Sequence, residues 1–468
     1  MIRPLIFATF FSATIFVSAK DYSLHTFRKI QLTDQFWAEG ASFGDFNRDG
    51  ENDIVSGPFW YEGPDFNTRH EFYPATESFK VKKPDGTEET IPGFEGALGV
   101  NNTYSRNFIA YCHDFNRDKW PDILVLGFPG AESFWYENPG EQKQSRVEGR
   151  KSSATGVPAS TLDSRLSTHW KRHTAIDVTD NESPTFGDLT GDGKPEIICS
   201  SKGFLGYAEP DWKNPTNKWT WHNISPDNKY HKFTHGLGYG DVNGDGRKDI
   251  LEKDGWWEQP KSLGGDPLWK QHKFPFASAQ GGAQMYVYDV NGDKLNDVIT
   301  SLAAHGYGLV WYEQLPANKE SGEIDFKQHI ILKKDATPND YGVSFSQPHA
   351  IELVDIDGDG LKDIVTGKRF WAHGNKGDAD PNGAAVLYWF QLVRSKDKSV
   401  QFVPHLIDND SGVGTQVLAG NVNEDKLPDI VVGNKKGTFV HLHEKKKVSK
   451  KEWEAAQPKQ RVSTSDAK

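Results

Sequence analysis

One short pattern occurs seven times in this chain: an acidic nine-residue loop that runs straight into a strand rich in β-branched residues. The copies read DFNRDGEND, DFNRDKWPD, DLTGDGKPE, DVNGDGRKD, DVNGDKLND, DIDGDGLKD and NVNEDKLPD, and they begin at Asp45, Asp114, Asp188, Asp241, Asp289, Asp355 and Asn421. A repeated unit of this size buries its apolar face against its neighbours. The chain is therefore expected to be an array of similar units.

Oxygen side chains occupy loop positions 1, 3, 5 and 9 in most copies, and oxygen is the ligand that a cation of calcium's size requires. The loop differs from an EF-hand, whose twelve-residue loop ends in glutamate and lies between helices. The segments before these loops are short and rich in glycine and aromatic residues, which favours strands. Each loop is therefore predicted to be the tip of a β-hairpin.

Glycine at loop position 6 permits the left-handed backbone that wraps a loop around an ion. Four loops keep this glycine, and their predicted calcium ligands are Asp45, Asn47, Asp49, Asp53, Asp188, Asp192, Glu196, Asp241, Asn243, Asp245, Asp249, Asp355, Asp357, Asp359 and Asp363. Lysine replaces the glycine in the other three loops, which costs about 1–2 kcal/mol and adds positive charge near the ion. The alternative is that these turns merely satisfy their own backbone.

Two further strands follow each loop in the expected unit. The first is aromatic, as in FWYEGP at Phe59, and the second carries a histidine in six units, which we interpret as a packing or hydrogen-bonding residue. The seventh histidine strand, with His25, precedes the first loop. Successive loops begin 48 to 74 residues apart, and the shortest spacing fits a four-stranded propeller blade. We expect an all-β fold, a seven-bladed β-propeller whose ring is closed by the N-terminal strand.

These motifs resemble the FG-GAP/VCBS repeat family, which also forms the heads of integrin α-subunits. The stretch GDVNGDGRKDIL from Gly240 carries the resemblance most closely, and the similarity extends over about residues 24–444. It implies that the loops bind calcium for stability, on the face away from the ligand site. The stretch from His235 to Pro260 also looks like the propeller domain of aldos-2-ulose dehydratases, which convert keto-sugars by elimination.

The ends of the chain differ from the repeats in composition. We expect a secretory signal peptide at residues 1–19, the propeller at residues 20–444 with insertions near 63–105 and 141–167, and a charged disordered tail at residues 445–468. Cleavage after Ala19 would give a secreted or periplasmic protein, which we expect to be a monomer. The net charge of −11 arises largely from the acidic loops. We expect no nucleic-acid partner, because no basic stripe is present, and no membrane span.

A candidate functional site lies six residues before each loop. With the inner strands aligned on loop position 1, the equivalent residues are Glu39, Phe108, Glu182, His235, Ala283, His349 and Thr415. Basic residues at the ends of the second strands are expected on the same face: Lys202, Lys253, His305, Lys368, Arg369 and Lys435. Single charged residues at strand ends are usually solvated, but the shared register predicts that these side chains meet at the mouth of the central shaft.

The predicted catalytic set is Glu39, Glu182, His235, His349, His305, Lys253 and Arg369. Two histidines would ligate a divalent transition metal, with a glutamate as third ligand or general base. Such a site suits proton abstraction beside a carbonyl or carboxylate, so we expect a carbon–oxygen lyase or dehydratase acting on a carbohydrate, either a keto-sugar or a uronate. The alternative is a non-catalytic propeller that binds glycan or protein, because the fold itself does not decide between them.

Overall fold

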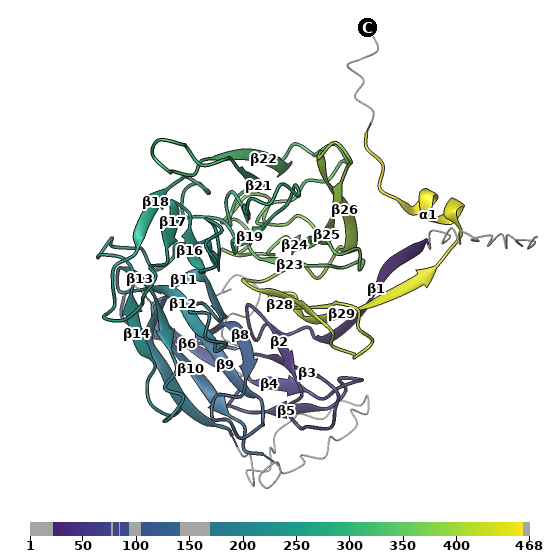
Figure 1. Cartoon of the computed structure of the whole chain (residues 1–468). Helices are drawn as coiled ribbons and strands as arrows, with labels where there is room; N and C mark the ends of the chain where they lie inside the picture. Colours follow the sequence, from purple (N-terminus) through teal and green to yellow (C-terminus); the bar gives the residue numbers. More distant parts are fainter. Residues whose placement is uncertain (1–21, 76–77, 84, 93–103, 141–168, 462–468) are drawn as a thin grey trace, which may run out of the picture.

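A computed structural model describes residues 22–75, 78–83, 85–92, 104–140 and 169–461. The predicted signal peptide and the predicted insertion at 141–167 lie outside these residues, as do residues 93–103 of the first insertion. The described residues form antiparallel β-sheets and one short helix, so the chain is an all-β protein (Figure 1). No helix in these ranges is long and apolar enough to cross a membrane.

Each acidic loop joins two antiparallel strands, which confirms the predicted hairpins. The pairs are β2 (Ser42–Gly44) with β3 (Asp53–Ser56), β8 (Asn107–His113) with β9 (Asp122–Gly127), β11 (Lys171–Gly187) with β12 (Glu196–Ser201), β15 (Leu237–Gly240) with β16 (Asp249–Glu252), β19 (Tyr286–Tyr288) with β20 (Asp297–Ser301), β23 (Ile351–Val354) with β24 (Asp363–Gly367), and β27 (Val417–Gly420) with β28 (Asp429–Asn434).

The aromatic strands and the histidine strands follow as expected. The aromatic strands are β4 (Phe59–Tyr61), β10 (Ala131–Glu137), β13 (Phe204–Glu209), β17 (Gly255–Glu258), β21 (Leu309–Gln314), β25 (Leu387–Arg394) and β29 (Gly437–Lys447). The separate histidine strands are β5 (Arg69–Glu71), β14 (Thr220–Asn223), β18 (Lys270–Lys273), β22 (Phe326–Leu332) and β26 (Val400–Asp408). The first half of β11 is the histidine strand of β10, and its second half is the inner strand of the next unit.

The histidines of these strands have a packing role, as predicted. The ring of His70 stacks on Trp60 with 3.9 Å between ring centroids, and its Nε2 lies 3.1 Å from a carboxylate oxygen of Glu62. The same stacking recurs in four other units, at Trp135–His173, Trp256–His272, Trp311–His329 and Trp389–His405. The aromatic strand therefore supplies one aromatic face and one acceptor for each of these histidines; the acceptor is a glutamate in four units and Gln391 for His405.

The inner strands of neighbouring sheets lie side by side, as β2 with β8, β15 with β19, and β23 with β27. Apolar side chains fill the space between the sheets; one such cluster contains Ile54 and Phe59 from one sheet and Val431 and Val440 from the next. Residues four positions before the loops, such as Ala41, belong to these clusters, as the sequence predicted. Figure 1 shows the sheets following one another around a common centre.

The two ends of the described chain share one sheet. Strand β1 (Ser23–Thr33) pairs antiparallel with β29, from Ser23 opposite Lys447 to Thr33 opposite Thr438. A further hairpin, β6 (Ser78–Lys82) with β7 (Glu88–Pro92), lies within the first predicted insertion.

The described part of the tail, residues 445–461, differs from the expected disorder. Strand β29 continues to Lys447, and helix α1 spans Lys450–Ala456. A capping box begins this helix: the Glu452 amide donates to Ser449 Oγ at 3.2 Å, and the Ser449 amide donates to the Glu452 carboxylate at 2.9 Å. Trp453 also packs against Tyr22, with 5.4 Å between ring centroids. These local contacts order a segment whose composition suggested a solvated chain.

Candidate functional site

The residues six positions before the loops are buried, which corrects the expectation of an exposed shaft mouth. Glu39 and His349 are each 0% exposed, His235 is 2% exposed and Glu182 is 4% exposed. Their backbones are tied to the adjoining sheet: the Glu39 amide donates to the Asn107 carbonyl at 2.9 Å, and the Glu182 amide donates to the Thr234 carbonyl at 2.8 Å. The connections at this end of the sheets cover the side chains that the strand register brings together.

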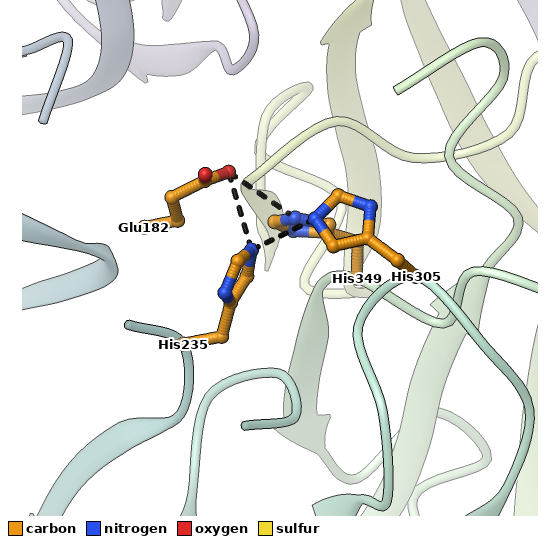
Figure 2. Close-up of side chains that lie close together, drawn as sticks. All are labelled: Glu182, His235, His305 and His349. Carbon is orange, nitrogen blue, oxygen red and sulfur yellow. Dashed lines mark hydrogen bonds and ion pairs between the residues drawn. The ribbon is translucent and has the colours of Figure 1, made fainter. Parts of the chain in front are cut away.

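Four side chains from four different sheet segments converge at this end (Figure 2). Glu182 lies on β11, His235 and His349 precede β15 and β23, and His305 follows β20. His235 Nε2 lies 3.0 Å from His305 Nε2 and 3.3 Å from Glu182 Oε2, and His349 Nε2 lies 3.4 Å from the same carboxylate oxygen. One ligand atom from each residue falls within 4.8 Å of all the others. We call these four residues the histidine–glutamate cluster.

Three of the separations in this cluster are close to those in the coordination shell of a transition metal. Ligands at about 2.0–2.2 Å from a tetrahedral ion are about 3.3–3.6 Å apart. The two carboxylate–imidazole separations, 3.3 and 3.4 Å, lie in this range, and the 3.0 Å between His235 and His305 is slightly shorter. Three imidazoles and one carboxylate are a donor set that suits zinc and other first-row metals. The Nδ1 atoms of His235 and His349 are buried without a hydrogen bond, so both rings direct their polar contacts toward the cluster centre.

The protonation states also suit ligation. Burial, followed by the neighbouring His349, His235 and Arg369, lowers the pKa of His305 to about 2. Burial, followed by Arg369, lowers the pKa of His349 to about 3. Burial would raise the pKa of Glu182, but His235, His349 and Arg369 outweigh it and hold that pKa well below its usual range. Neutral imidazoles and an ionised carboxylate are the forms that bind metal.

Arg369 neutralises the carboxylates of this end of the molecule. It is 1% exposed, its Nη2 lies 3.0 Å from Glu39 Oε2, and its Nη1 lies 3.3 Å from Glu182 Oε2. Nη1 also donates to His349 Nε2 at 2.8 Å. A metal would have to take over the lone pair of His349 that now accepts this hydrogen bond.

Two residues that the sequence reasoning missed lie beside His305. Asp378 Oδ1 is 3.5 Å from His305 Nδ1 and 2.8 Å from His373 Nδ1, and the side chain of Asp378 is 5% exposed. Both residues come from the long connection at residues 368–386, between β24 and β25. The corresponding connection between β16 and β17 contains two residues, so its unusual length was the available signal. A carboxylate behind a ligating imidazole can orient the ring, but at 3.5 Å the contact with His305 is an ion-pair distance and not a hydrogen bond, because His305 Nδ1 has no hydrogen-bond partner in the described residues.

The predicted basic residues divide into two groups. Lys368, Arg369 and Lys435 are buried at the same end as the cluster. Lys253 is not part of it: its ammonium pairs with the neighbouring Asp254, and its side chain is 21% exposed. No contact in the described residues joins this lysine to the cluster, which corrects its predicted place in the catalytic set.

The acidic loops lie at the opposite ends of the inner strands. Position 6 has a left-handed backbone in all seven, including the lysine-bearing loops, for example φ 89° at Gly360 and 77° at Lys119. The carboxylates of Asp355, Asp357 and Asp359 lie within 4.8 Å of one another. In two other loops a predicted ligand pairs with a basic neighbour: Asp192 with Lys194, and Asp245 with Arg247.

The carboxylate at loop position 9 has a structural role in each hairpin. Asp53 is 0% exposed, and its two oxygens accept hydrogen bonds from the amides of Phe46 at 2.8 Å and Gly63 at 2.9 Å. Asp363 likewise accepts from Ile356 and Leu392. In six of the seven hairpins this side chain therefore also joins the loop to the end of the aromatic strand, whereas, among the described residues, Glu196 accepts hydrogen bonds only from Leu189 and Thr190 within its own loop.

Comparisons with known proteins give no assignment. No protein-family model matches the chain, and no curated protein matches it. Among solved structures, a lectin from Agrocybe aegerita, described for its recognition of non-reducing terminal N-acetylglucosamine, is 14% identical with a TM-score of 0.40, and the match covers 79% of this chain and 93% of the lectin. An auxiliary nutrient binding protein from Bacteroides ovatus is 10% identical with a TM-score of 0.40, and the match covers 78% of this chain and 82% of that one. Similarity at this level carries no conclusion about function.

Proposed function

We propose that the chain is a seven-bladed β-propeller with calcium-binding loops on one face and a transition-metal centre for elimination chemistry at the other end. The seven repeated hairpins support the blade number. The pairing of β1 with β29 supports closure of the ring by the N-terminal strand. We place the protein outside the cell or in the periplasm, on the signal-like sequence at residues 1–19.

The observation that carries the metal centre is the convergence of Glu182, His235, His305 and His349 from four sheet segments. These residues would hold the ion, and the Asp378 carboxylate lies 3.5 Å behind His305, close enough to orient the ring if the two move into hydrogen-bond contact when the ion binds. A bound divalent ion would act as a Lewis acid toward a carbonyl or carboxylate oxygen of the substrate.

The residues around the cluster suit a β-elimination on a carbohydrate. A proton leaves the carbon beside a carbonyl or carboxylate, and its electron pair forms a carbon–carbon double bond. The carbon–oxygen bond at the next carbon then breaks, and the departing oxygen takes up a proton. Glu39 is the proposed base, because its Oε1 is buried and makes no hydrogen bond. Arg369 would stabilise the negative charge that develops on the substrate.

One observation favours a non-catalytic binding propeller as the second candidate. Arg369 already pairs with Glu39 and Glu182 and donates to His349, so the network is neutralised to a large extent without a metal. In that case the cluster would be a structural element, and glycan or protein would bind elsewhere on the surface. Metal content distinguishes the two candidates.

Replacing His235 and His349 together by glutamine is expected to remove the transition metal from the purified chain. Loss of two ligands lowers metal affinity by at least the 10- to 100-fold that changes of supporting residues produce. The measurement is elemental analysis after reloading with zinc or manganese and gel filtration. His329→Gln is the matched control, because that histidine stacks on Trp311 in an outer strand and should leave the metal in place. A wild-type chain that retains no transition metal would contradict the proposal.

Removal of calcium is expected to lower the melting temperature. A ligand that binds the folded chain at a hundredfold excess over its Kd stabilises it by about 2.7 kcal/mol per site. Asp355→Ala should reduce the response to calcium more than Asn421→Ala, because the Asp355 loop has three carboxylates within 4.8 Å of one another. Differential scanning calorimetry with EDTA and with calcium tests this, and identical melting curves would exclude calcium binding by the loops.

A further inference from the structure

Two lysines beside the histidine–glutamate cluster are buried without a carboxylate partner. Lys368 is 1% exposed and Lys435 is 2% exposed, and within the described ranges their ammonium groups contact a hydroxyl and backbone carbonyls rather than a carboxylate. Lys368 Nζ donates to Ser346 Oγ at 2.5 Å and to the Asp380 carbonyl at 2.6 Å. Lys435 Nζ donates to the carbonyls of Trp371 at 2.8 Å and Ala372 at 3.2 Å. A lysine is rarely buried so completely unless it is paired.

Both lysines adjoin Arg369. Lys368 is its neighbour in the chain, and Lys435 Nζ and the Arg369 guanidinium approach the same ring, that of Tyr104, at 4.9 and 5.9 Å from its centroid. Lys435 and Arg369 therefore lie against the same ring, and the Lys368 side chain leaves the backbone one residue before Arg369 and contacts Ser346 and Asp380. Burial lowers the pKa of each lysine to about 8, so both ammonium groups are largely charged at neutral pH.

The carboxylates at this end already have partners. Glu39 and Glu182 pair with Arg369, and Asp378 pairs with His373. Asp380, whose backbone carbonyl accepts from Lys368, is exposed, so water screens its charge. Three buried carboxylates thus face three buried cations, and a divalent metal ion would leave an excess of positive charge.

We propose that the ligand of this site carries an acid group, and that Lys368 and Lys435 bind the carboxylate of a uronate in preference to a neutral keto-sugar. This inference rests on the proposed function, for which both substrate classes were open. In elimination from a uronate, negative charge grows on the carboxylate beside the carbon that loses its proton, and fixed cations in a dry site stabilise it. The aromatic surroundings of Tyr104 and Phe108 strengthen such interactions because they exclude water.

A competing explanation is that the lysines simply hold the connection at residues 368–386 in place. Their partners include the carbonyls of Trp371, Ala372 and Asp380, all in that connection. Under this explanation, removal of either ammonium would weaken the fold but would not change how the protein distinguishes a charged from an uncharged sugar. The ratio of the binding affinities for a sugar acid and for its methyl ester therefore distinguishes the two explanations.

The test is calorimetric binding of matched sugars to the full-length chain loaded with manganese. The probes are disaccharides that end in glucuronate, galacturonate or mannuronate, each with its methyl ester, which keeps the shape and removes the charge. At least one acid is expected to bind about 10- to 100-fold more tightly than its ester. Lys368→Met and Lys435→Met should lose most of this preference. Lys253→Met is the matched control and should keep it, because that lysine pairs with Asp254 at an equivalent strand end.

Each outcome of these binding measurements supports or overturns the inference. Acids that bind no better than their esters would overturn the inference, and this comparison needs only the wild-type chain, even if the methionine variants fail to fold. Variants that keep the full preference would overturn the assignment to the lysines. A chain that prefers the acid to its ester through these lysines, but retains no transition metal, would support uronate binding by the lysines and reject the metal-dependent reaction. Turnover that favours neutral keto-sugars would support the proposed elimination and reject uronate binding by the lysines.

Discussion

Replacing Arg369 by methionine is expected to destabilise the folded chain by roughly 3–5 kcal/mol, the usual effect of removing one partner from a buried ion pair. The side chain is 1% exposed and is the charged partner of both Glu39 and Glu182. Its loss would leave two carboxylates in a region that excludes water, where an unpaired charge is highly unfavourable. Urea denaturation followed by tryptophan fluorescence measures the change in the free energy of unfolding.

Two further variants separate charge from packing at this position. Arg369→Lys keeps the charge but cannot form the same fork of hydrogen bonds, so it should recover part of the stability. The triple variant Arg369→Met, Glu39→Gln, Glu182→Gln removes the three charges together and should be more stable than Arg369→Met. A loss below about 1 kcal/mol in Arg369→Met, the range of surface ion pairs, would contradict the buried network.

Removal of β1 is expected to abolish the soluble, folded protein. This strand covers the edge of β29 along eleven residues, and Ile30 and Leu32 pack on the cluster that contains Val440 and Leu442. A chain that begins at Phe36 would expose this edge and its apolar side chains, which favours edge-to-edge association. Size-exclusion chromatography and thermal melting provide the measurement. A chain that begins at Lys20 is the control, and equal solubility and stability of the two chains would reject closure by β1.

The repeat predicted the hairpins and the convergence of three of these side chains correctly, because both follow from local patterns. Acidic loops of constant length place equivalent residues at equivalent heights on the inner strands. Counting six residues back from each loop therefore identified Glu182, His235 and His349, although they are far apart in the sequence. Because the repeated units are arranged with approximate symmetry, residues at the same position in each unit come close together in space. A single sequence can therefore predict which residues of this kind converge.

The features that the sequence did not reveal arise from irregular segments. The burial of the cluster depends on connections that do not repeat, and Asp378 and His373 come from the longest described connection near it. Lys253 was misplaced because strand-end position does not fix side-chain direction after a two-residue turn. The ordered helix α1 depends on a capping box and one tertiary contact, that of Trp453 with Tyr22, which composition does not represent.

Anomalous diffraction from a crystal of the metal-loaded protein tests the central claim most directly. Data collected on both sides of the absorption edge locate the metal without assumptions about its ligands. We predict a peak about 2.0–2.2 Å from the Nε2 atoms of His235, His305 and His349 and from a carboxylate oxygen of Glu182. Arg369 should then have moved away from His349 Nε2, with which it shares a 2.8 Å hydrogen bond here. The absence of a peak at this position, with that hydrogen bond intact, would contradict the metal centre and favour a binding propeller.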